Sequence, residues 1–349
     1  MEDGDAGSLL IKSNFLHQQG RFFWKSNDYK IAKDCFKESL AIRNRLVEEN
    51  EQPAPGFYLG LVAATQNNLG VLYMEEHNFE KAKTHLLDSL KIDSGLAEND
   101  PGAYIPYKAT NLCDLGMMHT YQKDFESAEK SYDAALKIYR ELAEENPYKY
   151  EPKLAKTLLY KGNVLTDQKK FEEALPVMQE SLLIYGKYEK INPEAYRPVL
   201  SETYHKLGKL FRKADNFEQA RENYERSLEI REALWLEAPE VYADEYAATL
   251  NNLGRFFQES GEPEKAERCF NASLEIDEAL MQSNEKVYVV YQLYNLKDLG
   301  FFYASVGRKA EARAYFQKAI EVFNRLPEPR KANLQFGLDL LRKKLEELS

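Results

Sequence analysis

The residues of this sequence that could serve catalysis or metal binding are few and widely spaced. The histidines and cysteines, which most often act as metal ligands or nucleophiles, are His17, His77, His85, His119, His205, Cys35, Cys113 and Cys269. No two histidines have the i, i+4 spacing of a helical metal site, and the cysteines fit neither a disulfide framework nor a zinc site. There is no glycine-rich phosphate loop. We therefore predict a protein that is not an enzyme and holds no metal or cofactor.

The charge of the chain argues against nucleic acid as a partner. Asp and Glu outnumber Lys and Arg by 57 to 47, which gives a net charge of −10, whereas phosphate binding needs a basic field. No stretch approaches the roughly 18 apolar residues of a membrane span. The first residues lack the basic and apolar regions of a signal peptide. With three cysteines that are expected to be reduced, the sequence predicts a soluble, cytoplasmic protein.

An internal repeat organises the chain. Seven glycines, separated by 50 residues once and by 46 residues thereafter, are Gly20, Gly70, Gly116, Gly162, Gly208, Gly254 and Gly300. Alanine stands twelve residues after each glycine, a bulky residue sixteen after, serine or alanine nineteen after, and leucine or isoleucine twenty after. Agreement at four offsets in all seven units indicates a repeat protein.

The offsets also indicate what each unit is. A glycine inside an apolar helix marks a place where a second backbone approaches closely. The alanine and the small residue allow the same approach from the next helix, and the bulky residue fills the space beside the contact. Two antiparallel helices packed in this way leave an apolar face uncovered, and stacking of such hairpins covers it. The spacing therefore predicts an all-α fold of seven helical hairpins.

This pattern resembles the tetratricopeptide signature. The segments Gln66–Gly70 and Leu250–Gly254, which read QNNLG and LNNLG, resemble the long-repeat branch typified by kinesin light chains. The common 34-residue unit ends its second helix with a proline 24 residues after the glycine, and no unit here has one. Both helices are therefore expected to reach roughly 20 residues, about 30 Å. The resemblance implies an α-solenoid with a right-handed superhelix that binds proteins or peptides, although the family has many unrelated ligands.

Turn signals place the boundaries between units. The predicted repeats are 8–52, 53–100, 101–146, 147–192, 193–238, 239–284 and 285–326, after a disordered tail of residues 1–7. Beyond Pro327 and Pro329, leucines on one face of residues 330–348 predict an amphipathic helix, which assigns 327–349 to a C-terminal cap. A helix that docks onto a partner is the alternative.

A tyrosine stands twelve residues before six of the repeat glycines. These residues are Tyr58, Tyr104, Tyr150, Tyr196, Tyr242 and Tyr288. We interpret them as residues that pack each helix start against the neighbouring unit, because aromatic residues repeated in register usually serve the repeat interface. A ladder for ligand binding is the alternative interpretation.

The resemblance also implies which positions line a concave groove, since the first helix of each tetratricopeptide unit faces inward. Asn67 and Asn251, three residues before their glycines, match relatives in which an asparagine amide holds an extended peptide backbone. Such an amide can both donate and accept hydrogen bonds. The alternative is that both residues hydrogen-bond to the neighbouring helix.

A group of basic residues lies at groove positions of units four to six. Its members are Lys156, His205, Lys209, Arg212, Lys213 and Arg255. Basic residues within an otherwise acidic protein favour an acidic or carboxylate-bearing ligand. Pairing of some of these bases with glutamates of adjacent units is the alternative.

The sequence thus predicts a non-catalytic scaffold or adaptor whose groove holds a protein or an extended, acidic peptide. The alternative function is a sensor whose superhelix changes shape when a ligand or signalling peptide binds. Self-association would require an exposed apolar patch on an outer face.

Overall fold

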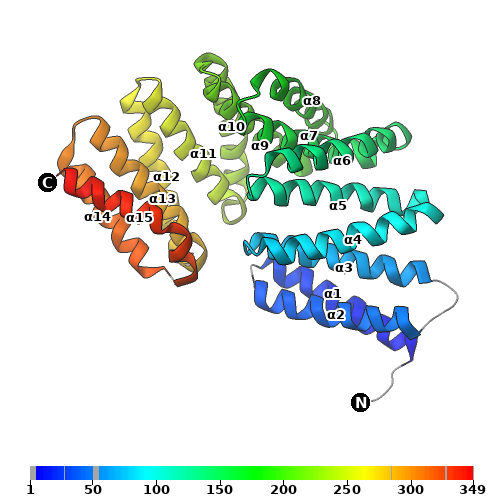
Figure 1. Ribbon diagram of the computed structural model, residues 1–349. Coiled ribbons are helices and arrows are strands. Elements are labelled where there is room, and N and C mark those ends of the chain that lie inside the picture. The colour runs from blue at the N-terminus through cyan, green and yellow to red at the C-terminus, as the bar shows by residue number, and fades with distance from the viewer. Residues whose placement is uncertain (1–4, 27, 50–54, 284, 327, 349) are drawn as a thin grey trace. The chain divides into compact units, whose positions relative to one another are not determined.

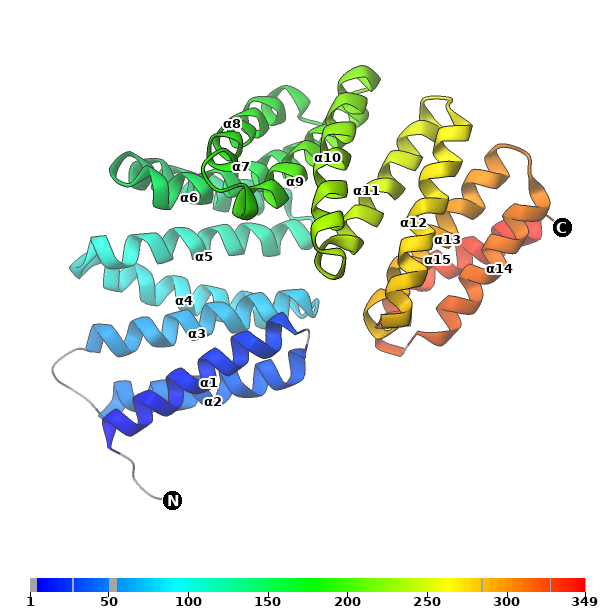
Figure 2. The same ribbon diagram turned by 180° about the vertical axis from the view of Figure 1, so that it is seen from behind.

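In the computed structural model, helix follows helix, and no strand occurs among the described residues, which are 5–26, 28–49, 55–283, 285–326 and 328–348 (Figures 1 and 2). The chain divides into two compact units, residues 1–184 and 185–349, and the division falls within the eighth helix. Within each unit, consecutive helices pack against each other. The predicted all-α repeat fold is confirmed.

The helices have the lengths expected from the extended repeat, and most contain 21 residues. The first unit contains α1 (Ala6–Lys25), α2 (Tyr29–Glu49), α3 (Pro55–Glu75), α4 (Phe79–Asn99), α5 (Pro101–Tyr121), α6 (Phe125–Glu145) and α7 (Pro147–Asp167), and α8 (Phe171–Glu189) spans the division. The second unit contains α9 (Pro193–Lys213), α10 (Phe217–Glu237), α11 (Pro239–Glu259), α12 (Pro263–Ser283), α13 (Glu285–Ser305), α14 (Lys309–Arg325) and α15 (Glu328–Glu347).

The helix starts follow the predicted turn chemistry. Asn146 accepts a hydrogen bond from the backbone N–H of Lys149 at 3.2 Å, and Pro147 occupies the first turn of α7. Proline suits this place because its fixed φ is helical and its missing N–H would have no helical partner. Helix α1 begins two residues earlier than expected, because Asp5 accepts a hydrogen bond from the N–H of Ser8 at 2.8 Å. The last residues of the disordered tail predicted over residues 1–7 therefore belong to the start of α1.

The repeat glycines lie where the two helices of each repeat come closest. A Cβ atom placed on any of the seven would lie 2.4–2.8 Å from the side chain sixteen residues later, closer than Cβ atoms pack in proteins. At Gly208 the neighbour is the ring of Tyr224, which is 2 % exposed. The close approach expected from the spacing is therefore present in every repeat.

The small residue nineteen positions after the glycine also forms a hydrogen bond in five repeats. Ser227 Oγ donates to the backbone carbonyl of Ser201 at 2.9 Å, and Ser273 Oγ donates to that of Ala247 at 2.7 Å. Equivalent bonds occur in repeats one, two and four. A buried hydroxyl needs a partner, and this bond supplies it while joining the two helices of the hairpin.

Tyrosines in register contact the preceding repeat, as Tyr104 and Tyr196 show. Tyr104 Oη donates to the backbone carbonyl of Gly56 at 3.1 Å. The ring of Tyr196 lies 5.3 Å from that of Tyr188 on the preceding second helix. These contacts support the interpretation of both tyrosines as residues of the repeat interface.

The C-terminal helix covers the last repeat. Leu338 and Leu341 of α15 are buried in the same apolar cluster as Phe316 and Phe323 of α14, and Leu345 packs against it. The side chain of the leucine at position 334, which the predicted apolar face included, lies outside the described residues. Helix α15 thus occupies the place expected of a cap.

We predict that Gly208→Ala lowers the melting temperature of the second unit, whereas Gly186→Ala raises it slightly. The new Cβ at position 208 would meet Tyr224 at 2.7 Å, and overpacking of this kind costs about 1–3 kcal/mol. Gly186 is a matched control, because it lies in α8 and a Cβ there would meet nothing within 4 Å. Replacing it with alanine gains helix propensity of about 1 kcal/mol. Thermal unfolding followed by circular dichroism measures both changes, and shifts of equal sign would contradict the packing argument.

Candidate functional site

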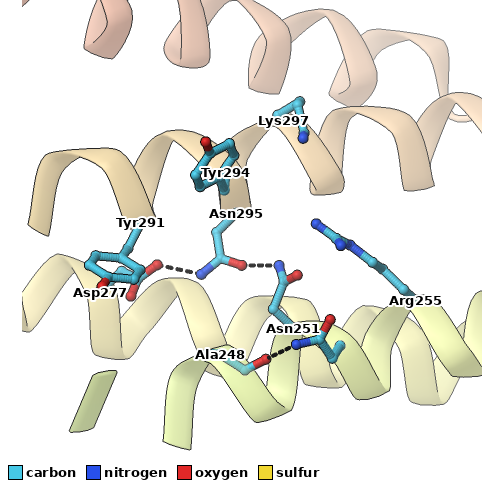
Figure 3. Close-up of a pocket in the computed structure, with 9 residues that line it drawn as sticks. Ala248, Asn251, Arg255, Asp277, Tyr291, Tyr294, Asn295 and Lys297 are labelled. Atoms are coloured by element: carbon cyan, nitrogen blue, oxygen red, sulfur yellow. Dashed lines mark hydrogen bonds between the residues drawn. The ribbon is translucent and has the colours of Figure 1, made fainter. Parts of the chain in front are cut away.

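A polar pocket of 260 Å³ opens in the second unit between α11 and α13 (Figure 3). Its walls are formed by Ala248, Asn251, Asn252 and Arg255 of α11, Asp277 of α12, and Tyr291, Tyr294, Asn295 and Lys297 of α13. Residues three and four apart in a helix lie on one face. The four α11 residues therefore share one face of their helix, and Tyr291, Tyr294 and Asn295 share one face of α13. These two faces line the pocket.

A chain of amides forms the floor of the pocket. Asn251 Nδ2 donates to Asn295 Oδ1, and Asn295 Nδ2 donates both to Asp277 Oδ2 and, at 2.8 Å, to Ser273 Oγ. Asn251, Asn295 and Asp277 are all buried. The hydrogen bonds compensate for the loss of water around these groups. The amide of Asn251 therefore bonds to the neighbouring first helix, as the alternative interpretation of this residue expected.

Two cations share one carboxylate at the rim. Arg255 Nε donates to Asp298 Oδ2 at 3.0 Å, and a second donor of the same guanidinium also contacts that oxygen. Lys297 Nζ lies 3.7 Å from Asp298 Oδ1 and 5.0 Å from the centre of the Tyr294 ring. Among the described residues this ammonium forms no short hydrogen bond, so its donors can reach a ligand. The rings of Tyr291 and Tyr294 are about four-tenths exposed beside it.

Burial changes the protonation of groups around the pocket. Burial raises the pKa of Asp277 to about 6, although the hydrogen bond from Asn295 acts in the opposite direction. His205 of α9 lies behind the pocket, with Nε2 3.4 Å from the Asn252 amide nitrogen. Burial, followed by the positive charge of Arg231, lowers the pKa of His205 well below its usual value. The imidazole is therefore neutral at pH 7 and does not contribute the positive charge assigned to it from the sequence.

The other predicted basic residues occupy two helices outside the pocket. Arg212 Nη1 donates to Glu259 of the next repeat at 2.9 Å, so this base is paired between adjacent repeats, as the alternative interpretation expected. Lys209 is half-buried and Lys213 is exposed, both on α9. Lys156 lies on α7 in the first unit, exposed, with Nζ 5.5 Å from the centre of the Tyr160 ring.

The first unit contains an equivalent amide network, which includes the second predicted asparagine. Asn67 Nδ2 donates to Asn111 Oδ1 and to Asp114 Oδ2, both at 2.8 Å, and Asn111 Nδ2 donates to Asp93 Oδ2 at 2.7 Å. Counted from the repeat glycines, these residues hold the same positions as Asn251, Asn295, Asp298 and Asp277. Burial raises the pKa of Asp93 to about 7 and that of Asp114 to about 6.

The two networks differ in their cations. Val71 stands at the repeat position of Arg255, and Cys113 stands at that of Lys297. At these two repeat positions the second unit therefore has cations and the first unit has none, although both units share the buried framework.

Sequence reasoning missed Asp277, Asn295 and Asp298. The sequence comparison aligned the same position in each repeat. These residues instead bond to partners at different positions of a neighbouring repeat. The recurrence of Asn, Asn, Asp and Asp at identical positions in repeats two to three and six to seven was the signal that could have revealed them.

In the part of the chain that the structure describes, no group of three or more His, Cys, Asp or Glu side chains could hold a metal ion. Within the same residues, no helix has both the length and the apolar character needed to cross a bilayer.

Family models for the tetratricopeptide repeat match residues 61–141, 153–233, 247–280 and 296–326. The chain belongs to the tetratricopeptide repeat family. These matches cover most of the helical hairpins described above and confirm the prediction from the glycine register. None of the curated protein sequences matches this tetratricopeptide repeat protein.

Several solved structures share the fold of this tetratricopeptide repeat protein. Aspartyl phosphate phosphatase F from Bacillus subtilis is 14 % identical, with a TM-score of 0.61 over 92 % of this chain and 72 % of that one. A Rap protein complexed with Competence and Sporulation Factor is 15 % identical, with a TM-score of 0.54 over 99 % of this chain and 100 % of that one. BtubC (BKLC) from P. vanneervenii is 22 % identical, with a TM-score of 0.55 over 70 % of this chain and 92 % of that one. At these identities the similarity concerns the fold.

We predict that Asp277→Asn stabilises the protein relative to wild type at pH 7.5 and that this advantage shrinks as the pH falls to 5. A carboxyl whose pKa rises from 3.8 to about 6 on folding contributes stability that is complete at low pH. That contribution is lost as the pH rises through 6, because the native state must then hold a buried charge. Asparagine keeps an oxygen that accepts from Asn295 but cannot ionise.

Melting temperatures of both proteins between pH 5 and pH 7.5 test this expectation. Glu225→Gln, at an exposed carboxylate of α10, is the control and should show no such trend. A stability difference between Asp277→Asn and wild type that does not vary with pH would contradict the burial argument.

Proposed function

We propose that this protein is a non-catalytic scaffold whose pocket between α11 and α13 binds an acidic segment of another protein. The observation that carries the proposal is the rim of the pocket, where Arg255 and Lys297 share the single carboxylate of Asp298. The other carboxylate of the pocket, Asp277, bonds to Asn295 in the floor, so at the rim one carboxylate faces two cations in a chain whose net charge is −10. A carboxylate of a ligand supplies the missing negative charge.

The aromatic rings and amides of the pocket suit a peptide. The partly exposed faces of Tyr291 and Tyr294 offer apolar area at low entropic cost, and Tyr is enriched at protein interfaces for this reason. Asn251 and Asn252 line the same wall and bring amide groups to a peptide backbone. The buried network from Asn251 to Asp277 fixes these groups before binding, which reduces the entropy lost on association.

The shape of the pocket favours a scaffold over a sensor of small molecules. Small-molecule sites are usually enclosed, mostly apolar cavities of about 300–1,000 Å³. The present pocket is smaller, at 260 Å³, and polar groups form much of its wall. A side chain or chain terminus of a longer partner fits such a recess better than a complete ligand does. One similar structure, that of a Rap protein, contains a bound factor, which agrees with a binding role for this fold.

We predict that the double variant Arg255→Gln, Lys297→Gln binds an acidic partner segment at least tenfold more weakly than wild type. Charge-assisted hydrogen bonds contribute about 1.5–3 kcal/mol each. Synthetic peptides that span each protein captured by the full chain would identify the acidic segment that binds. Fluorescence anisotropy would then measure the affinity of that peptide for wild type and variant. The difference between variant and wild type should decrease in 0.5 M salt, because exposed charges are then screened.

The control removes the same charge elsewhere in the second unit. Arg226→Gln with Arg268→Gln neutralises two exposed bases on α10 and α12 and should leave affinity within about twofold. Equal weakening by both double variants would show a general charge effect and would refute the pocket as the binding site. Glutamine at position 255 can still donate to Asp298, so both double variants should remain folded.

A further inference from the structure

Helix α1 exposes a face that is buried in every other first helix of the chain. In repeats two to seven, the residue five before the glycine and the residue two after it are at most 4 % exposed. These residues are Thr65, Asn111, Thr157, Thr203, Thr249, Asn295, Leu72, Met118, Val164, Leu210, Phe256 and Phe302. Phe15 and Phe22 hold the same two positions in α1 and are 62 % and 64 % exposed.

In the later repeats, this face is covered by the second helix of the preceding repeat. Thr65 accepts a hydrogen bond from Arg43 of α2 at 2.5 Å. The ring of Phe302 lies 5.6 Å from that of Phe270 on α12. Helix α1 with α2 forms the end of the first unit (Figures 1 and 2), and no described helix covers α1 on this side. Because a helix covers the equivalent face in the later repeats, a helix is the structure that fits the exposed face of α1.

The residue types on this face indicate an apolar partner surface. Position five before the glycine is threonine or asparagine in repeats two to seven, and in four of these it bonds to a polar side chain of the preceding helix. Phe15 cannot form such a bond. Ile11, four residues before Phe15, adds a third apolar side chain on the same face and is 72 % exposed. Three large apolar side chains at helical spacing mark an interaction surface.

The charges on α1 indicate the sign of the charge that a partner should carry. The helix contains Lys12, Arg21 and Lys25 and no acidic residue. Lys12 pairs with Glu38 of α2 at 2.8 Å, and Arg21 and Lys25 are exposed beside Phe22. A second copy of α1 would bring like charges together, which costs binding energy. An acidic helix would meet opposite charges.

We propose that the face of α1 formed by Ile11, Phe15 and Phe22 docks an acidic amphipathic helix of another protein. This site lies in the first unit and is independent of the pocket between α11 and α13. The docked helix would lie on α1 as the second helix of the preceding repeat lies on the first helix in repeats two to seven, with its apolar side chains on the two phenylalanines and its carboxylates near Arg21 and Lys25.

The test uses the full chain and a synthetic peptide with the sequence of α6, Phe125–Glu145. Within the chain, α6 packs against the following first helix, α7. It has six acidic and three basic residues, a net charge of −3. We expect this peptide to bind the wild-type chain in fluorescence anisotropy. A peptide whose acidic residues are replaced by their amides should bind several-fold more weakly.

Two surface variants locate the binding. Phe15→Ser with Phe22→Ser should weaken peptide binding at least tenfold, whereas the matched control Leu236→Ser with Val241→Ser, at two exposed apolar residues of the second unit, should not. Arg21→Gln with Lys25→Gln keeps the apolar face and should reduce affinity several-fold in low salt.

Three outcomes would overturn the proposal. The α6 peptide could fail to bind, or it could bind the Phe15, Phe22 variant as tightly as wild type. The chain alone could instead form a dimer in light scattering that the same variant dissociates, which would make a second copy the occupant. Circular dichroism would verify that each variant keeps the helical content of wild type.

Discussion

The fold depends on one steric constraint, the close approach of two helices at each repeat glycine. There the next helix places a buried side chain, such as Tyr224 or Phe316, where a Cβ atom would otherwise be. Protein interiors are packed as densely as organic crystals, so the contact fixes both the distance and the rotation of the paired helices. With that geometry fixed, the residues on the outer faces of each hairpin have defined neighbours in the next hairpin.

Buried polar pairs then connect successive repeats. Arg43 bonds to Thr65 and Arg231 to Thr249, whereas Asp93 bonds to Asn111 and Asp277 to Asn295. In each pair, a residue 23 after one glycine meets a residue five before the next. A buried polar group without its partner costs about 1–3 kcal/mol, so these pairs oppose any sliding of one hairpin over another. The pocket in the second unit is a part of this framework that reaches the surface.

The sequence was sufficient to predict the helical hairpins, their lengths and their turns, because glycine, alanine and proline act locally and recur in register. It was not sufficient to predict the pocket. Asn251 was recognised as a polar residue of the first helix, but its partner Asn295 stands at a different repeat position, so comparison in register could not connect them. The same limitation applies to Arg255, whose partner Asp298 neutralises part of the charge assigned to the groove. His205 appeared to be a surface base, and only burial in the folded chain identifies it as neutral.

The recurrence of these pairs bears on how such a chain can gain, lose or exchange repeats. Repeats two and six present the same pair of interfacial residues, threonine toward the preceding repeat and aspartate toward the following one. Recombination that exchanges these two repeats would leave the Arg–Thr and Asp–Asn pairs intact. Loss of repeat six alone would place Asn295 against the guanidinium of Arg231 instead of the carboxylate of Asp277, so the amide N–H groups that now donate to Asp277 would face a group that cannot accept. The chain is therefore modular only for particular combinations of repeats, and its genetic history is constrained by buried polar chemistry as well as by the shape of the hairpin.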